Sequence, residues 1–365
     1  MRDLGILSWP HTATQMGYGN HDHSRSRNQV SDVAMASVGW QERWPRARAL
    51  VAAVMVAGVA GCGNASTQPG HPPSAQPRPP AAQQPMAQQP VATTEADWSG
   101  VAQALGRPGK LTETVYRVAL PRSDLGVVSR GVPIKPGLSL GGYAVFIRYP
   151  DATMLMGDLV VTEAELPRVT DALLTNSVDI TGLHKHLLEQ SPAIWWMHVH
   201  AMGDPVQLAK GLRAALDATA IAPSASLPAP QSPLGLDTAG IDTALGRKGT
   251  ADGAIYKVSI SRGDTIVQDG HVLPAGLGLT TAVNFQPAGG GQAVINGDIV
   301  MTGNEVQKVI TALRQGGIDI VEVHNHGLDE QPRLFYLHFW AVNDAVALAR
   351  ALRPALDATN LKPTS

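Results

Sequence analysis

The chain has 365 residues, 28 basic and 30 acidic side chains for a formal net charge of −2, and a single cysteine, Cys62. One thiol excludes an internal disulfide framework and any zinc or iron–sulfur site that needs several thiolates from one chain. The basic excess typical of nucleic-acid-binding proteins is absent, so no nucleic acid is expected as a partner.

Residues 1–61 have the layout of an N-terminal extension followed by a signal peptide. Three arginines between residues 43 and 48 precede the apolar run ALVAAVMVAGVA, residues 49–60. As a helix this run would rise about 18 Å, well short of the roughly 30 Å hydrocarbon core, which argues against a transmembrane helix. Starting translation at Met35 would give a basic region of ordinary length.

The only cysteine ends this apolar run, in the sequence Val59-Ala60-Gly61-Cys62, which resembles the bacterial lipobox. That resemblance implies cleavage before Cys62 and attachment of a diacylglycerol, with acyl chains such as palmitate, to its sulfur. Two acyl chains anchor a protein stably where one is marginal. We therefore expect a lipoprotein bound to the extracytoplasmic side of the cell membrane. The alternative is an ordinary secretory signal with an accidental cysteine.

Beyond a Pro/Gln-rich spacer, the sequence repeats itself at an offset of 140 residues. Leu216-Asp217-Ala218-Thr219 recurs at residues 356–359, and Gly157-Asp158 recurs as Gly297-Asp298. A gene duplication is the simplest account, and it predicts two tandem domains or one pseudo-symmetric double domain. The expected segments are the spacer 62–95, repeat unit 1 at 96–219, a linker at 220–235 and repeat unit 2 at 236–365.

Within one unit, the apolar pattern predicts an α+β fold: an antiparallel sheet with helices packed on one face. The expected elements of the first unit are a helix at 97–105 capped by Asp97, strands at 114–120, 143–149 and 153–161, a helix from Thr162 to 174, strands at 178–187 and 193–202, and a helix at 204–216. Thr162 and Glu165 fit a capping box, which Thr302 and Glu305 repeat.

Seven of the eight histidines beyond residue 95 lie in the last strand pair of the two units. They are His184, His186, His198 and His200 in the first unit and His324, His326 and His338 in the second. Residues two apart in a strand share a face. If His186 pairs with His198 and His184 with His200, the four rings of the first unit form one square. The same register would place His324 opposite Trp340, and a slip of one residue would separate the rings.

Three or four neutral imidazoles at this spacing suit a divalent transition metal such as Zn²⁺. Glu189 could complete a site or act as a base, and Asp158 could orient a histidine from behind. Because Trp340 replaces the fourth histidine, the first unit is expected to hold the stronger site. Three other interpretations stay open: a hydrogen-bonded structural cluster, a pH-sensitive surface and a pocket for a non-metal ligand.

Two classes of function fit these features. One is a membrane-anchored envelope protein that binds a metal ion or small ligand through the histidines of the first unit. The other is a metal-dependent envelope enzyme, a hydrolase or an oxygen-using enzyme, that works through the same cluster. The sequence contains no His-Glu-x-x-His motif or EF-hand loop that would decide between them.

The lipobox, the spacer and a duplicated unit carrying LHKHLLEQSPAIWWMHVHAMGDP, residues 183–205, resemble the LppY/LpqO lipoproteins of mycobacteria and related actinomycetes. The resemblance spans roughly residues 95–360. That family is a domain of unknown function, so the resemblance implies an envelope location and a two-copy architecture but no activity and no catalytic residues. The second copy departs from the motif at Trp340 and Asn343.

Overall fold

The computed structural model describes residues 86–221 and 234–363. The signal peptide, Cys62, most of the spacer and most of the expected linker lie outside these residues. Within the part of the chain that is described, no helix combines the length and the apolar character needed to cross a membrane.

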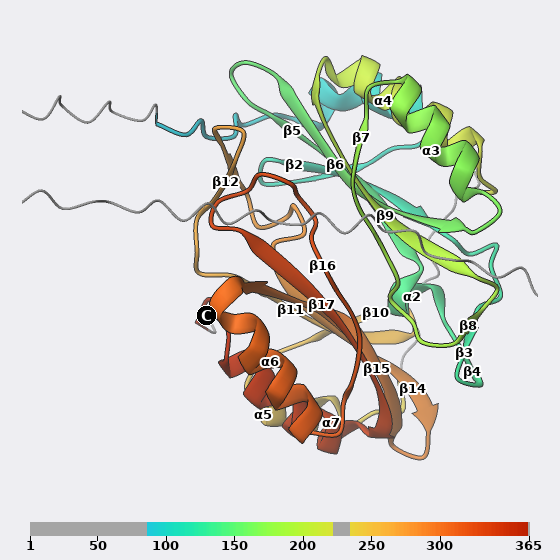
Figure 1. Ribbon diagram of the computed structural model, residues 1–365, viewed down its shortest axis with the longest axis vertical. Coiled ribbons are helices and arrows are strands. Elements are labelled where there is room, and N and C mark those ends of the chain that lie inside the picture. The colour runs from blue at the N-terminus through green and yellow to red at the C-terminus, as the bar shows by residue number, and fades with distance from the viewer. Residues whose placement is uncertain (1–85, 222–233, 364–365) are drawn as a thin grey trace, which may run out of the picture. The chain divides into compact units, whose positions relative to one another are not determined.

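Each repeat forms a six-stranded antiparallel sheet, and both sheets have the same strand order (Figure 1). The first sheet runs β1 (Lys110–Thr112), β2 (Val115–Pro121), β5 (Gly141–Arg148), β6 (Thr153–Thr162), β9 (Ile194–Gly203) and β7 (Asp179–His184). The second runs β10 (Thr250–Asp252), β11 (Ile255–Ser261), β14 (Thr280–Gly289), β15 (Gln292–Thr302), β17 (Leu334–Asp344) and β16 (Asp319–His324). The predicted fold class and the tandem duplication are confirmed.

Helices cover one face of each sheet, as Figure 1 shows for α3 and α4 on the first. The helices of the first repeat are η1 (Glu95–Trp98), α1 (Ser99–Leu105), α2 (Pro136–Ser139), α3 (Leu166–Thr175) and α4 (Pro205–Asp217), and those of the second are α5 (Thr238–Leu245), α6 (Gly303–Gln315) and α7 (Ala345–Asp357). In the first repeat, Leu105, Val169 and Leu212 from three helices pack with Phe146 and Leu155 of the sheet. Burial of such side chains is the main source of stability.

The faces that carry no helices pack against each other, and the two repeats belong to one compact unit. One shared cluster joins Val145 and Met154 of the first sheet to Val300 of the second, and another joins Trp196 to Trp340. Two short sheets lie beside them: β3 (Val128–Ser129) with β4 (Val132–Pro133) and β8 (Gln190–Ser191), and β12 (Ile266–Gln268) with β13 (His271–Leu273). The duplication has therefore produced a pseudo-symmetric double domain.

Helix starts and stops follow the expected local signals with two exceptions. One is the helix predicted from Thr162, which begins at Leu166 because residues 163–165 form a turn. Glu165 and Thr162 bond each other's backbone amides, as a capping box requires. Gly106, at φ 70°, ends α1 in the left-handed conformation that favours glycine. The predicted cap at Asp97 is wrong: Thr94 begins the helical segment, and its amide donates to the Asp97 carboxylate at 2.7 Å. Because that carboxylate reaches back to Thr94, the chain turns three residues earlier, as a 3₁₀ turn.

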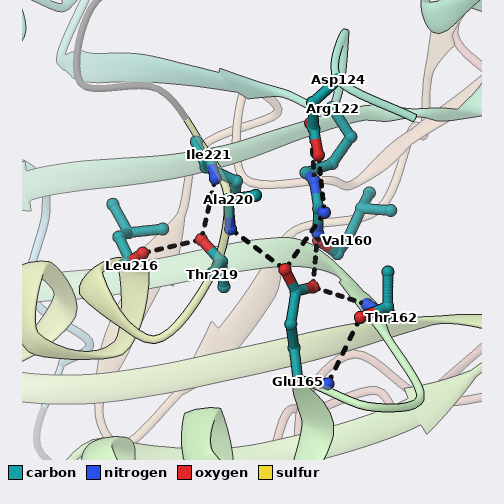
Figure 2. Close-up of polar contacts among 9 residues, drawn as sticks. All are labelled: Arg122, Asp124, Val160, Thr162, Glu165, Leu216, Thr219, Ala220 and Ile221. Atoms are coloured by element: carbon teal, nitrogen blue, oxygen red, sulfur yellow. Dashed lines mark hydrogen bonds and ion pairs between the residues drawn. The ribbon is translucent and has the colours of Figure 1, made fainter.

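A buried ion-pair network fixes each repeat's sheet to its helices (Figure 2). Arg122, only 1% exposed, donates to Glu165 at 2.7 Å, to Asp124 at 2.9 Å and to the carbonyl of Val160 at 2.9 Å. Glu165 also accepts the amide of Ala220 at 3.0 Å, which holds the segment that follows α4. Burial raises the pKa of Glu165, but its hydrogen bonds from Arg122 and backbone amides outweigh this, so the net pKa is lowered and the carboxylate is ionised at neutral pH.

The second repeat builds the same network around Arg262. That guanidinium donates to Glu305 at 2.7 Å and to the carbonyl of Val300 at 2.9 Å, and Glu305 accepts the amide of Asn360 at 2.9 Å. Since both copies keep these partners, the network belongs to the architecture of the repeat.

Candidate metal centre

Six histidines, three from each repeat, meet between the two sheets. Ring centroids of His184 and His324 lie 3.7 Å apart, those of His186 and His338 lie 3.6 Å apart, and those of His198 and His326 lie 3.8 Å apart. Each of these contacts joins one repeat to the other. The offset of 140 residues between the repeats relates the His186–His338 contact to the His326–His198 contact. The cluster therefore has the pseudo-two-fold symmetry of the duplication.

The central strands place a histidine and an aspartate side by side in each repeat. His198 on β9 lies opposite Asp158 on β6, and His338 on β17 lies opposite Asp298 on β15. The Nδ1 of His338 lies 2.7 Å from the carbonyl oxygen of Gly297. When Nδ1 donates there, Nε2 carries the free lone pair that a metal ligand needs.

Glycine precedes both aspartates because no side chain fits at that point of the strand. A Cβ atom on Gly157 would lie 2.9 Å from the carbonyl oxygen of Tyr143, and one on Gly297 would lie 2.1 Å from that of Ala282. Neither glycine forms a bulge, because the strand pairing is regular on both sides. Both glycines therefore mark a close approach between neighbouring strands.

Two of the histidines lie just beyond their strands and are held by the opposite repeat. The backbone carbonyl of His326 accepts the Thr181 hydroxyl at 2.5 Å, and the backbone carbonyl of His186 accepts the Asn296 amide at 2.6 Å. Asn325 donates in turn to the carbonyl of Thr181 at 2.7 Å. These bonds fix the backbone on both sides of the cluster, so the positions of His186 and His326 depend on both repeats.

Many polar atoms of the cluster are buried without a hydrogen-bond partner. They are Nε2 of His186, His324, His326 and His338, Nδ1 of His184 and His324, and Oδ1 of Asp158 and Asp298. Nε2 of His184 lies 2.8 Å from Nε2 of His198. Buried polar groups are otherwise nearly always satisfied, and each exception calls for an explanation such as a missing ion.

Burial sets the charge state of the cluster. It lowers the pKa of all six histidines, and the neighbouring imidazoles lower it further for most of them, so the rings are neutral. Burial raises the pKa of Asp158 to about 7, with the nearby Asp298 as a further cause, and raises that of Asp298 to about 6. Neutral imidazole is the form that binds metal.

Three overlapping groups of ligand atoms lie within 4.8 Å of one another and could hold a metal ion. They are His184 with His198 and His324, His184 with His186 and His338, and Asp298 with His324 and His326. Two of the three combine both repeats. Imidazole and carboxylate donors in this number suit Zn²⁺ and similar divalent transition metals.

The strand register assumed from the sequence is wrong. In the structure His184 lies opposite Trp196, Gly182 opposite His198, and Asp179 opposite His200. The shift of four residues arises because the connection between the strands is long: it includes β8, which pairs with β3 instead of closing a tight hairpin. Because the shift is even, the histidines stay on the expected face of the sheet. Their closest ring-to-ring contacts, however, are with histidines of the other repeat.

Two of the candidate residues lie away from the six histidines. His200 has its Nε2 3.8 Å from an Asp269 carboxylate oxygen and belongs to none of the three groups. Glu189 is exposed and pairs with Arg130 at 3.1 Å. Asp158 does join the cluster, with a carboxylate oxygen 3.9 Å from Nε2 of His186.

A cavity of about 630 Å³ leads to the centre. Its lining includes His186, His326, Asp158 and Asp298, so part of the cluster faces this space. Tyr143 also lines it, and sequence reasoning did not single that residue out. Only the pairing of β5 with β6, which sets Tyr143 opposite Asp158, brings the phenol to the site.

The family model of a domain of unknown function, DUF1259, matches residues 99–218 and again residues 239–358. The chain belongs to the DUF1259 family. Both matched copies of DUF1259 contain the three histidines that meet in the cluster. No curated protein matches the chain.

Two solved structures show a weak likeness to this DUF1259 protein. The trimeric bacterial microcompartment shell protein PduB is 13% identical over 67% of this chain and 86% of its own, with a TM-score of 0.16. EtuB from Clostridium kluyveri is 12% identical over 68% and 89%, with a TM-score of 0.17. At these scores neither supports an argument about fold or function.

Proposed function

We propose that this protein binds a divalent transition-metal ion, such as Zn²⁺, in one centre that the two repeats build together. One observation carries the proposal: several buried imidazole nitrogens have no hydrogen-bond partner. The possible ligand atoms of these histidines lie within 4.8 Å of one another in each group. A purely structural cluster would leave these atoms unsatisfied, at a cost of roughly 1–3 kcal/mol each. A bound cation would satisfy several of them at once.

Elemental analysis of the purified full chain, after growth with added zinc, tests this proposal. The wild type is expected to retain metal, and His184→Ala and His324→Ala are each expected to lose it, because the two histidines share one centre across the repeats. His200→Ala is the matched control and should retain metal. Circular dichroism checks that each variant is folded, and Asp298→Asn gives a milder second variant. A metal-free wild type, or equal loss in His200→Ala, contradicts the proposal.

We further propose that the protein is an envelope lipoprotein of the LppY/LpqO type, anchored to the membrane through Cys62. The lipobox and the Pro/Gln-rich spacer support this. We expect Cys62→Ser to move the protein from the membrane fraction to the soluble fraction, because the acyl chains would have no attachment site. If that variant stays in the membrane fraction after cell fractionation, the proposed lipid anchor is contradicted. The proposed metal centre is not affected by that result.

A metal-dependent enzyme is the second candidate function, and the cavity favours it. Two histidines and two aspartates of the cluster line that space, so a small molecule could reach the centre. Chemically, a divalent ion with an open coordination position supplies activated water. The carboxyl of Asp158, whose pKa is raised to about 7, is suited to exchange a proton near neutral pH. A closed shell of four protein ligands, seen by X-ray absorption, would argue against catalysis.

A further inference from the structure

The cavity at the histidine cluster adjoins a second hollow of about 440 Å³, which none of the cluster histidines lines and which we call the outer hollow. The two share Arg117, Tyr143 and Lys257 in their linings. A ligand in this space would therefore have one end at the histidines and aspartates and the other beside these shared residues. Figure 1 shows the strands that carry them, β2, β5 and β11.

Three basic side chains line the outer hollow, against one acidic residue, Asp252. Arg117 and Lys257 occupy equivalent positions, 140 residues apart, and Lys135 precedes α2. Within the described residues, neither Arg117 nor Lys135 makes an ion pair, and Lys257 pairs only with Asp252, at 2.9 Å on the exposed side. Arg117 and Lys135 are therefore available for an anionic ligand, and Lys257 can exchange its partly exposed contact with Asp252 for one.

Arg117 is held at the junction of the two hollows by Tyr143. Its guanidinium carbon lies 3.6 Å from the centroid of the Tyr143 ring, a cation–π contact. This contact orients a planar group with several N–H donors, which suits bidentate recognition of a carboxylate or phosphate. Tyr143 pairs with Asp158 across the strands, so the stacked pair borders the cluster directly.

The inner cavity, the one at the histidines, has acidic residues in addition to Arg117 and Lys257. Asp158, Asp298 and Glu113 line it, and their ionised forms would repel an anion when no metal cation is present. A bound divalent ion would offset that charge. The arrangement therefore favours a ligand whose acidic group lies beside Arg117 and Lys257 and whose other polar atoms face the proposed metal centre.

We propose that the joined cavities bind a small organic anion, whose carboxylate or phosphate group lies between Arg117 and Lys257. The ligand's remaining polar atoms extend toward the histidine cluster. This inference rests on the proposed metal centre, because the bound cation is what makes the inner cavity tolerant of an anion. It adds the substrate or ligand class, which the histidines alone do not indicate.

Isothermal titration of the zinc-loaded full chain with inorganic phosphate and, separately, with succinate tests the proposal. The two probes distinguish a phosphate from a carboxylate preference. We expect saturable binding of at least one probe, weakened at least about tenfold in Arg117→Gln and in Lys257→Gln with unchanged zinc content. Arg117→Lys should retain part of the affinity. Arg350→Gln, which changes an exposed arginine on α7, is the matched control and should bind as the wild type does.

Equal affinity in the wild type and Arg117→Gln would overturn the inference, as would the absence of binding of both probes to a chain that holds zinc. Zinc content is measured on the same samples. A chain that holds no zinc would overturn the proposed function instead. The anion site would then be tested separately, by the same titration of the zinc-free wild type and of zinc-free Arg117→Gln. Equal anion affinity of these two proteins would again contradict the anion site.

Discussion

The zinc-loaded chain is expected to unfold at a temperature roughly 5–10 °C above that of the chelated chain. A ligand that binds only the folded state stabilises it by about 2.7 kcal/mol when its free concentration is 100 times Kd, and a domain of this size shifts by about 2–4 °C per kcal/mol. The physical reason is specific to this fold. The proposed ligands lie on or just beyond β7, β9, β15, β16 and β17 and come from both repeats, so the proposed site disappears when the repeats separate.

Thermal unfolding with excess zinc and with EDTA measures this shift. His200→Ala should keep it, whereas a variant with both His184→Ala and His324→Ala should lose it. The same melting temperature in zinc and in EDTA for the wild type would contradict the prediction. So would a shift that survives in the double variant, because zinc would then be acting elsewhere on the chain.

Arg122→Ala is expected to destabilise the protein by about 3–5 kcal/mol, the range for removing one partner of a buried ion pair. The substitution would leave Glu165 buried without its cation and the carbonyl of Val160 without its donor. The affected bonds connect the sheet, the start of α3 and the segment that follows α4 (Figure 2). The free energy of unfolding in urea measures the effect.

Arg168→Ala is the matched control, because Arg168 is exposed on α3 and such substitutions are usually within about 0.5 kcal/mol of neutral. Arg262→Ala removes the equivalent residue of the second repeat and should cost a similar amount. A loss below about 1 kcal/mol for Arg122→Ala would show that the network stabilises little and that the packing of helices on the sheet dominates.

Local signals in the sequence predicted most of the secondary structure. Asp204 caps α4 by accepting two backbone amides, and β5 and β6 lie close to the strands expected at 143–149 and 153–161. These features depend on interactions between near neighbours, and such interactions can be deduced from a single sequence. The prediction that Asp97 caps the first helix was wrong because Thr94, three residues earlier, is the N-cap.

The candidate site was harder to predict, because its geometry depends on contacts between the repeats. The repeated histidines were recognised, but each copy was treated as a site of its own. One signal for the joint centre was present: β6 reads as an apolar run from Met154 to Val161, broken only by Gly157 and Asp158, and the structure buries it on both faces. A strand of that kind needs cover on its second face, and the only large element left to supply it was the other repeat.

The pocket could not be deduced from the sequence at all. Arg117 and Lys257 are ordinary exposed positions in a strand pattern, and nothing in the chain marks Tyr143 as their neighbour. Their importance follows from strand pairing between β2, β5 and β11 within each sheet and from the contact of the two sheets. Such long-range placement is set by packing and not by local sequence.

Anomalous diffraction from crystals of the zinc-loaded protein, recorded on both sides of the zinc absorption edge, tests the joint centre most directly. The account predicts an anomalous peak between the two sheets, with imidazole nitrogens of both repeats at about 2.0–2.1 Å from it. A peak bound by His184, His186, His198 and His200 of the first repeat alone would contradict it, as would a crystal with no zinc between the sheets.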